Sequence, residues 1–402
     1  MLRKNMKKIL IVLVFAMTPA CLKAQILGEL TIPMTGVSIE IPVELPPLSI
    51  SDSSRQLDAA GVSSAAMSFA LQKTPALFYA SDGTAMEWTY CAVLPPQSVS
   101  QEIRLKPSSQ EAIFSFTDNE DGRLLLSEND KPVLVYNFGL QLAPDVPEDR
   151  RRSTYVHPIY DPLGNVITDD FPADHLHHRG LSWMWPYVFL QGQKFDLWHI
   201  QGIRHKFESW LIREVGPVCA LLGSKNTWHL DDRVVMDEWV WLRIYKACEN
   251  GRAIDITLTW KAREKIEITG ESEKGYGGLC FRFAPRRETV IVTSDGLASK
   301  DSDLKRMEWA DESGKFGAEE NISGVAIFQH ADNPNFPAGW TLRHYGFLGV
   351  AWPGRQMLTL DPLQSVTVKY RVWLHRGDAE TGQVEEAYRV FEQQQKILFK
   401  KS

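Results

Sequence analysis

The sequence is poor in cysteine and has no paired-cysteine motif. Only five cysteines occur among the 402 residues, and none stands in a Cys-x-x-Cys spacing, which argues against a zinc ribbon or a dithiol redox centre. Cys91, Cys219, Cys248 and Cys280 lie within or beside apolar, strand-like segments. A chain of this length can build a hydrophobic core without disulfides. We therefore expect buried free thiols, with a disulfide framework as the alternative.

Motifs of several enzyme classes are also missing. The chain has no Gly-x-Ser-x-Gly nucleophile elbow and no His-Glu-x-x-His zinc motif. The glycine-rich stretch at residues 275–287 lacks the strand, loop and helix context and the Lys-Ser/Thr of a phosphate-binding loop. Positive charge is scarce, since 44 Lys and Arg face 50 Asp and Glu. We expect no nucleic-acid partner, because phosphate binding depends on clustered basic residues.

Long apolar runs are absent except at the N-terminus. There, "MLRKNMKKILIVLVFAMTPACLKAQ" combines a basic start with an apolar run too short to span a bilayer, which is typical of a secretory signal. We expect a signal peptide over residues 1–24, with cleavage before Gln25. Lipidation of Cys21 is the alternative. The protein is then periplasmic or secreted, with no transmembrane segment after cleavage.

Short alternating segments dominate the rest of the chain. "AIDITLTWKARE" and "SVTVKYRVWLHRG" are typical, being rich in Val, Ile, Thr and aromatic residues. They predict an all-β protein built as a large antiparallel β-sandwich, for which a galactose-mutarotase-like supersandwich is one candidate. We expect a small N-terminal β domain over residues 25–110 and a large sandwich over 111–378. Apolar residues at helical spacing predict an amphipathic helix over 379–402.

The stretch "DHLHHRGLSWMWP" at residues 174–186 holds three of the ten histidines. If it is extended, His175 and His177 point to one face and His178 to the other. His175 and His177 could then ligate one divalent metal ion together with a third ligand. Alternatively, the three histidines serve as general acids or bases near neutral pH. A purely structural loop is the third reading.

Charged neighbours complete this candidate site. Asp174 is placed to orient a histidine, and Asp170 to do so or to bind substrate. Arg179 can hold a carboxylate or a developing negative charge. Arg282 points either into a cleft or to solvent. By contrast, His199 and His229 stand alone on β segments, and for them we expect structural roles.

A second polar and aromatic cluster spans residues 328–354, among Pro and Gly residues that favour an ordered loop. Aromatic rings that stack on a sugar, beside side chains that hydrogen-bond its hydroxyls, suit a carbohydrate. The candidate substrate-binding residues of the whole chain are Asp170, Trp183, Arg282, His330, Asn333, Trp340, Arg343 and His344.

Several motifs resemble a bacterial family named "methane oxygenase PmoA". They are "HPIYDPLGNVITDDFPADHLHHRGLSWMW", "GGLCFRFAP", "EWADESGKF", "GVAIFQHADNPNFPAGWTLRHYGFLG" and "YRVWLHRG", between about residues 133 and 377. The usual "DHPHHRGLW" of that family is changed here by Leu176 and by Ser182. A methane oxygenase of the copper type spans the membrane several times, so we reject that activity for this chain. The resemblance implies carbohydrate metabolism.

Three hypotheses remain open. The first is an exported carbohydrate-active enzyme, a lyase, hydrolase or epimerase acting on a sugar or an oxidised sugar, with His175, His177, His178, Arg179 and Asp174 as its catalytic residues. The second is a glycan-binding module without turnover, and the third is a structural protein. The first two require a small-molecule or oligosaccharide ligand, and the sequence does not define an oligomeric state.

Overall fold

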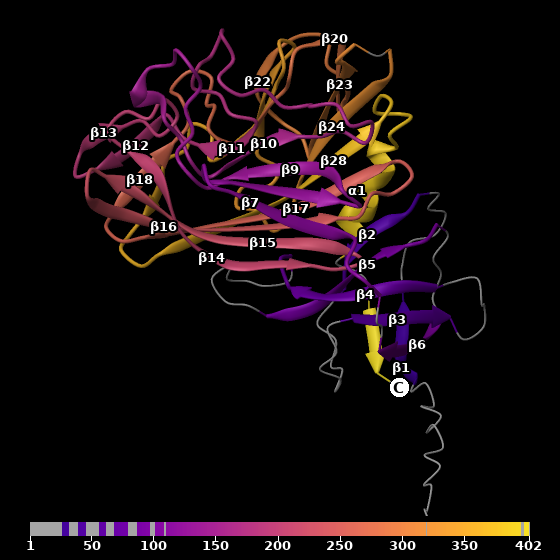
Figure 1. The fold of residues 1–402 in the computed structure, drawn as a ribbon. Helices are drawn as coiled ribbons and strands as arrows, with labels where there is room; N and C mark the ends of the chain where they lie inside the picture. The colour runs from indigo at the N-terminus through magenta and orange to yellow at the C-terminus, as the bar shows by residue number, and fades with distance from the viewer. Residues whose placement is uncertain are drawn as a thin grey trace, which may run out of the picture.

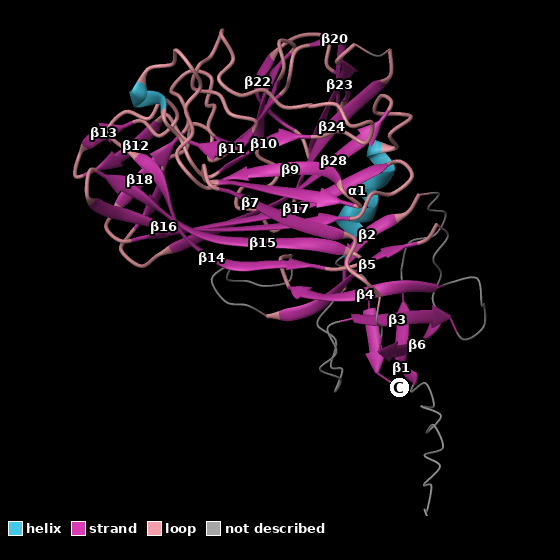
Figure 2. Ribbon diagram, viewed as in Figure 1, coloured by secondary structure: helices cyan, strands magenta, loops and turns pink. Residues whose placement is uncertain are grey.

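The structure is a computed structural model that describes residues 26–31, 39–45, 56–61, 68–78, 87–96, 101–107, 110–318, 320–394 and 398–401. The expected signal peptide over residues 1–24, including Cys21, lies outside the described residues. The described chain is almost entirely β, and all of its strand pairings are antiparallel (Figure 2). The prediction of an all-β protein with large antiparallel sheets is confirmed.

Two nine-stranded sheets form the sandwich (Figure 1). The first has the order β22 (Ser302–Arg306), β25 (Gly339–Arg343), β26 (Phe347–Ala351), β19 (Gly278–Arg282), β11 (Leu181–Met184), β10 (Tyr155–Ile159), β9 (Lys131–Asn137), β8 (Arg123–Glu128) and β7 (Phe114–Asn119). The second has the order β14 (Arg204–Val215), β15 (Cys219–Leu230), β16 (Arg233–Tyr245), β17 (Gly251–Ala262), β28 (Ser365–Arg376), β24 (Ile322–Gln329), β23 (Trp309–Phe316), β20 (Arg286–Thr293) and β21 (Gly296–Leu297). One large hydrophobic core draws residues from both sheets.

Two smaller sheets complete the fold. The strands β13 (Gln193–Phe195), β12 (Tyr187–Leu190), β18 (Ile266–Thr269) and β27 (Leu358–Leu360) form a four-stranded sheet. The N-terminal sheet has the order β2 (Ile41–Glu44), β5 (Trp88–Leu94), β4 (Ser68–Pro75), β3 (Gln56–Gly61), β6 (Gln101–Pro107), β1 (Ile26–Thr31) and β29 (Leu398–Lys401). A 3-10 turn, η1, spans Glu148–Arg150.

The C-terminal segment is a helix followed by a strand. Helix α1 spans Val384–Gln393 and buries Val384, Ala387, Val390 and Phe391, so the expected amphipathic helix is present. It does not continue to residue 402. Residues 398–401 form β29, which pairs with β1 and so adds a seventh strand to the N-terminal sheet. Pairing with the edge of another sheet is a tertiary effect that overrides the helical spacing of Leu398.

The second nine-stranded sheet is covered on both faces. Ile254, Ile256 and Leu258 of β17 belong to the core between the two large sheets. A second core joins the opposite face of this sheet to α1 and to strands β2, β4 and β5. This explains why β17 is buried along nearly its whole length, including the polar residues Asp255 and Thr257.

A buried charge cluster lies within this second interface. Arg243 of β16 donates to Glu44 of β2 at 2.7 and 2.8 Å, and Arg371 of β28 donates to Asp255 at 2.6 and 3.0 Å. All four side chains are at most 2% exposed. Burial raises the pKa of Glu44, while Arg243 opposes that rise. A buried charge is costly without its partner, so removal of either Glu44 or Arg243 would leave the other charge buried without that partner.

Candidate functional site

The histidine-rich segment is a pair of turns between β10 and β11. The backbone N–H of His175 donates to Pro172 O at 3.0 Å, and that of His178 donates to His175 O at 2.8 Å. The expectation for an extended segment, with His178 on the opposite face, therefore fails. The turns bring all three rings together: His175 and His178 stack at 4.6 Å between centroids, and His177 meets His178 edge-on at 4.6 Å.

Arg179 holds these turns in place. Its guanidinium donates to the backbone oxygens of Leu176, His178 and Arg150 at 2.9, 2.6 and 2.8 Å. Its Cζ lies 3.4 Å from the centre of the Phe171 ring, and its side chain is 0% exposed. These contacts use the guanidinium within the protein. The structure thus places Arg179 beneath the site as a positioning residue and leaves it no free face for a substrate anion.

Gly180 explains how closely the histidine turns approach β10. A Cβ at this position would lie 2.4 Å from Val156 O. No side chain fits there, so the chain reaches β11 through a glycine.

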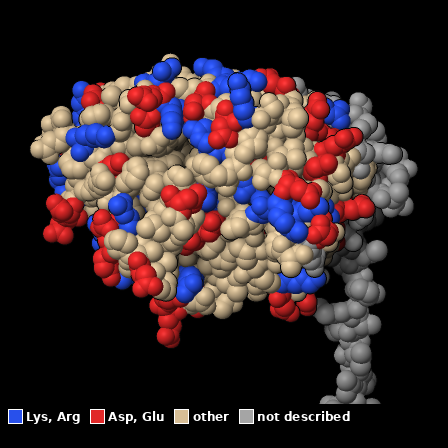
Figure 3. Space-filling model, turned by 90° about the horizontal axis from the view of Figure 1, so that it is seen from above, with Lys and Arg blue, Asp and Glu red and all other residues tan. Residues whose placement is uncertain are grey.

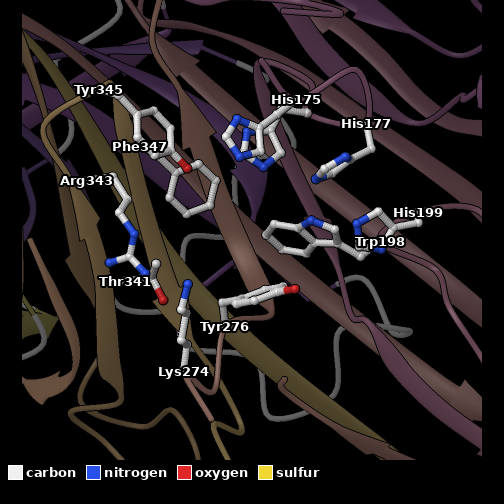
Figure 4. Close-up of a pocket in the computed structure, with 11 residues that line it drawn as sticks. His175, His177, Trp198, His199, Lys274, Tyr276, Thr341, Arg343, Tyr345 and Phe347 are labelled. Atoms are coloured by element: carbon white, nitrogen blue, oxygen red, sulfur yellow. The ribbon is translucent and has the colours of Figure 1, made fainter. Parts of the chain in front are cut away.

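A pocket of about 340 Å³ opens beside the three histidines (Figure 4). The histidine turns and the segment after β13 form one wall, and β25, β26 and the turn between them form the opposite wall. Lys274 and Tyr276 lie at the lower edge in this view. The lining residues are His175, His177, His178, Trp198, His199, Lys274, Tyr276, Thr341, Arg343, Tyr345 and Phe347.

Two of the lining histidines carry a carboxylate on Nδ1. Asp196 Oδ2 lies 2.9 Å from His199 Nδ1, and Asp196 Oδ1 accepts the backbone N–H of His199 at 2.8 Å. Asp174 Oδ2 lies 3.0 Å from His175 Nδ1. A carboxylate that hydrogen-bonds Nδ1, as Asp196 does at His199, fixes the proton there and leaves Nε2 as the basic nitrogen of the neutral ring. Asp174 lies close to His175 Nδ1 without the geometry of a hydrogen bond. Within the described ranges, neither Nε2 has a hydrogen-bond partner, so both remain available to a ligand.

The two pairs differ in how strongly the carboxylate is held. Asp174 also accepts two hydrogen bonds from Arg282 Nη2, at 2.8 and 2.9 Å, and its side chain is 45% exposed. Burial opposes ionisation of Asp174, but the proximity of His175 and the hydrogen bonds from Arg282 outweigh it and lower its pKa. Asp196 has no basic side chain as an ion-pair partner other than His199 in the described chain, and its side chain is only 12% exposed. The Asp196 carboxylate is therefore the less screened of the two.

The remaining two histidines are held neutral. Burial, followed by the nearby charges of His199 and His175, lowers the pKa of His177 to about 2. Burial also lowers the pKa of His178, assisted by His177 and His175. His177 lies between the two carboxylate-bound rings, with centroids 4.3 Å from His199 and 5.7 Å from His175. The wall is thus a row of imidazoles that remain uncharged at its centre.

The opposite wall carries positive charge and aromatic rings. Arg343 donates to the backbone oxygens of Ser302 and Leu342 and to Asp303 at 2.6 Å, so much of its charge is compensated. Lys274 is exposed, and its amine points into the pocket in Figure 4. No carboxylate of the described residues lines the cavity. This composition does not provide the carboxylate pair of a typical glycosidase.

Several residues expected at the site lie elsewhere. Trp183 and Trp340 are at most 1% exposed and belong to the large core, and Trp340 Nε1 donates to Met307 O at 2.7 Å. Successive side chains of a strand point to opposite faces. Because Thr341 and Arg343 of β25 face the pocket, Trp340 faces away from it. Neither indole can stack on a ligand in this pocket.

The loop after β24 also points away from the pocket. His330 stacks on Phe78 of the N-terminal part at 5.2 Å, and Asn333 exchanges two hydrogen bonds with the backbone of Lys369 at 2.7 Å each. His344 lies in a different segment, the turn between β25 and β26. Asp301 lies 2.8 Å from its Nδ1, and His344 is not among the residues that line the pocket. These three residues, expected to bind substrate, stabilise the fold around the site.

The two remaining predicted residues lie next to the pocket. Arg282 lines the back of the histidine turns, with its Cζ 4.8 Å from the Tyr345 ring centre, so its side chain points inward. Asp170 accepts a hydrogen bond from Tyr155 at 2.9 Å and lies 3.3 Å from Arg179 Nε. Burial raises the pKa of Asp170 to about 6 against the opposing effects of these two neighbours.

A metal site at His175 and His177 finds no support in the described ranges. Among those residues, no group of three or more His, Cys, Asp or Glu side chains could hold a metal ion. The Nδ1 atom of His175 lies 3.0 Å from Asp174 Oδ2. The third ligand that the hypothesis requires is therefore not found.

Most of the opposite wall was missed from the sequence. Lys274, Tyr276, Thr341 and Phe347, together with Trp198 on the histidine wall, line the pocket without having been predicted to do so. The structural role expected for His199 is corrected, because His199 lines the pocket and is bound by Asp196. One signal was present: Asp196 precedes His199 by three residues, and this spacing allows a carboxylate to reach both the backbone and the ring of the histidine. The other residues come from segments that only the sheet order brings together.

The fold and the site define an all-β sandwich with an imidazole-rich pocket against strands β25 and β26 of its first large sheet. The chain belongs to DUF6807, a family of unknown function whose model matches residues 123–389. No curated protein matches the chain. Among the described residues, no helix has the length and apolar character needed to cross a membrane.

The solved structures to which this chain is similar include the following three. A glycosyl hydrolase family 38 protein from Enterococcus faecalis is 10% identical, with 93% of this chain and 47% of that chain covered and a TM-score of 0.43. A GH36 alpha-galactosidase from Geobacillus stearothermophilus is 11% identical, with coverages of 67% and 40% and a TM-score of 0.34. A galactose mutarotase related enzyme from Lactobacillus acidophilus is 7% identical, with coverages of 65% and 97% and a TM-score of 0.31. The chain spans less than half the length of the first two, and at these TM-scores we take no chemistry from them.

Proposed function

We propose that this protein is an exported carbohydrate-active enzyme that removes a proton from an oxidised sugar, with elimination as the favoured outcome. The supporting observation is the row of pocket imidazoles, of which His199 and His175 carry a carboxylate on Nδ1. Such a pair makes Nε2 a general base and stabilises the imidazolium that forms. The resemblance to the PmoA-named family stays a prediction, and it supports a sugar as the substrate class.

His199 is the stronger candidate for the catalytic base. Its partner Asp196 is more buried than Asp174, and it is not shared with an arginine. A less screened carboxylate stabilises the imidazolium more strongly. His199 Nε2 therefore takes the proton from a carbon beside a carbonyl, and the Lys274 amine stabilises the negative charge that develops on the carbonyl oxygen.

The arrangement favours elimination over two-base epimerisation. His175, His177 and His199 lie along the same wall of the pocket (Figure 4). A base and an acid on one wall can take a proton and return it to a leaving oxygen on the same face of a sugar. Two-base epimerisation requires groups on opposite faces. The absence of a lining carboxylate among the described residues makes a two-carboxylate hydrolase a poor fit.

Aromatic side chains supply the binding surface. Tyr345 is 42% exposed and stacks against His175 at 5.2 Å between centroids, and Trp198 and Tyr276 lie together across the pocket at 4.9 Å. The CH face of a sugar ring packs against such surfaces. A volume of about 340 Å³ is at the lower end of the usual range for ligand pockets and suits one or two sugar units.

The test uses 3-keto-glycosides and the corresponding unoxidised glycosides with the full chain in D2O. We expect deuterium incorporation or elimination only with the oxidised sugars, and loss of both in His199→Gln. Ligand binding without exchange or turnover would show that the protein is a glycan-binding module and not an enzyme. Exchange that persists in a folded His199→Gln variant would refute the role of this base.

A further inference from the structure

Two cysteines meet at the interface between the N-terminal sheet and the sandwich. Cys91 lies on β5, and Cys219 is the first residue of β15. Their Sγ atoms are 3.4 Å apart although 128 positions separate them in the chain. Both side chains are 0% exposed.

The backbone around this pair is fixed by Gln72, whose Cα is the register partner of Cys91 in the pairing of β4 with β5. Gln72 Oε1 accepts the backbone N–H groups of Val218 and Cys219 at 3.1 and 2.9 Å, and its Nε2 donates to Cys219 O at 3.0 Å. A Cβ at Gly216 would lie 2.4 Å from Gln72 Oε1, so a glycine is needed for this approach. The two sulfurs are therefore brought together by hydrogen bonds in which they take no part.

We propose that Cys91 and Cys219 form a disulfide that ties the N-terminal sheet to the sandwich. A disulfide needs its sulfurs at about 2.05 Å, so the two sulfurs must approach from their present separation of 3.4 Å. The oxidant is a small-molecule or protein disulfide. One thiolate attacks it to give a mixed disulfide, and the second thiolate displaces the remaining thiol. Two protons and two electrons leave the pair, and the oxidant becomes two thiols.

The timing follows from burial. Burial raises the pKa of the Cys219 thiol well above its usual value, which keeps it unreactive once the interface has closed. The bond therefore forms while the N-terminal sheet is docking. Afterwards it is shielded from reductants in solution.

The other two described thiols have different neighbours. Cys280 Sγ lies 3.3 Å from Ser182 Oγ, and Cys248 Sγ lies 3.9 Å from Lys246 O. Neither contacts a cysteine among the described residues. The structure thus assigns one specific bond and leaves Cys248 and Cys280 as free thiols.

The full chain is refolded with oxidised and reduced glutathione, alkylated in guanidinium chloride and digested without reductant. We expect a linked pair of peptides that contains Cys91 and Cys219 and that separates on reduction, with Cys248 and Cys280 alkylated. The chain refolded under reducing conditions should have a Tm roughly 5 °C below that of the oxidised chain. The shift should persist in the matched Cys248→Ser/Cys280→Ser variant and vanish in Cys91→Ser/Cys219→Ser.

Complete alkylation of Cys91 and Cys219 before reduction would overturn the proposal, as would a bond to another cysteine. If Cys91→Ser/Cys219→Ser does not fold, the peptide maps of the unaltered chain and of Cys248→Ser/Cys280→Ser still show whether Cys91 and Cys219 are linked.

Discussion

Replacing Asp196 by Asn tests the proposed base with almost no change of shape. Asp196 Oδ1 accepts the backbone N–H of His199, so an amide oxygen keeps that position, and the amide NH2 group then faces Nδ1. Nδ1 must become an acceptor, and the proton moves to Nε2. The ring keeps its place but is in the wrong tautomer to accept a proton from a ligand.

The size of the effect follows from the contact. A charge-assisted bond of 2.9 Å, with the carboxylate only 12% exposed, is lost together with the correct tautomer. We expect kcat to fall by about 10²–10³-fold, which is about 3–4 kcal/mol of barrier. Stability should change little, because the backbone hydrogen bond survives.

Two measurements check this prediction. Nitrogen chemical shifts of labelled histidines report which ring nitrogen of His199 carries the proton, whatever the substrate is. Turnover reports the consequence. Asp301→Asn is the control, because Asp301 Oδ1 contacts both the backbone N–H and the Nδ1 of His344, at 2.9 and 2.8 Å, outside the pocket. If Asp196→Asn leaves tautomer and turnover unchanged, or if Asp301→Asn impairs turnover equally, the assignment of His199 is wrong.

Three further predictions concern stability. Arg179→Lys cannot serve three backbone oxygens in the same geometry, so it should lower the free energy of unfolding by about 2–4 kcal/mol in urea titrations; a change below about 0.5 kcal/mol would contradict its role under the histidine turns. Arg243→Met leaves Glu44 buried without its arginine and should cost about 3–5 kcal/mol by the same assay, whereas an unchanged midpoint would show that the cluster is dispensable. Burial lowers the pKa of His177 to about 2 and that of His157 to about 4. Below about pH 6.5 these histidines are therefore protonated in the unfolded chain while they stay neutral in the folded chain. Stability should therefore fall as pH drops below about 6.5, by up to about 1.4 kcal/mol per pH unit for each histidine, and His157→Gln should reduce this slope; a flat profile between pH 7 and 5 would refute it.

The strand content could be predicted from the sequence because alternation of apolar and polar residues follows directly from strand geometry. What alternation could not show is which polar face meets solvent. The Asp255 face of β17 looks like a solvent face, yet it is buried against the N-terminal sheet with Arg371 and Arg243. Burial of this face depends on strands of the N-terminal sheet that are more than 150 residues away in the chain. No local sequence pattern of β17 can indicate that contact.

The candidate site was predicted in part for a similar reason. The run of histidines marks one wall, because His175, His177 and His178 are neighbours in sequence. The other wall depends on β25 and β26 lying beside β19 and β11 in the sheet. Tyr345 and Lys274 therefore reach the pocket through strand order. Trp340 and Trp183 were poor choices because a large apolar side chain on a strand more often enters the core than a cleft.

The pairing of β29 with β1 has a consequence for how the chain folds. The N-terminal sheet is made from strands β1 to β6 and from β29, so its last strand leaves the ribosome only after both large sheets have been synthesised. Until then β1 exposes an unpaired edge, and such edges promote association between chains. Contacts this distant in sequence also slow folding, since the loop between them must close first. Early N-terminal fragments of this protein should therefore be the species most prone to aggregate during its synthesis.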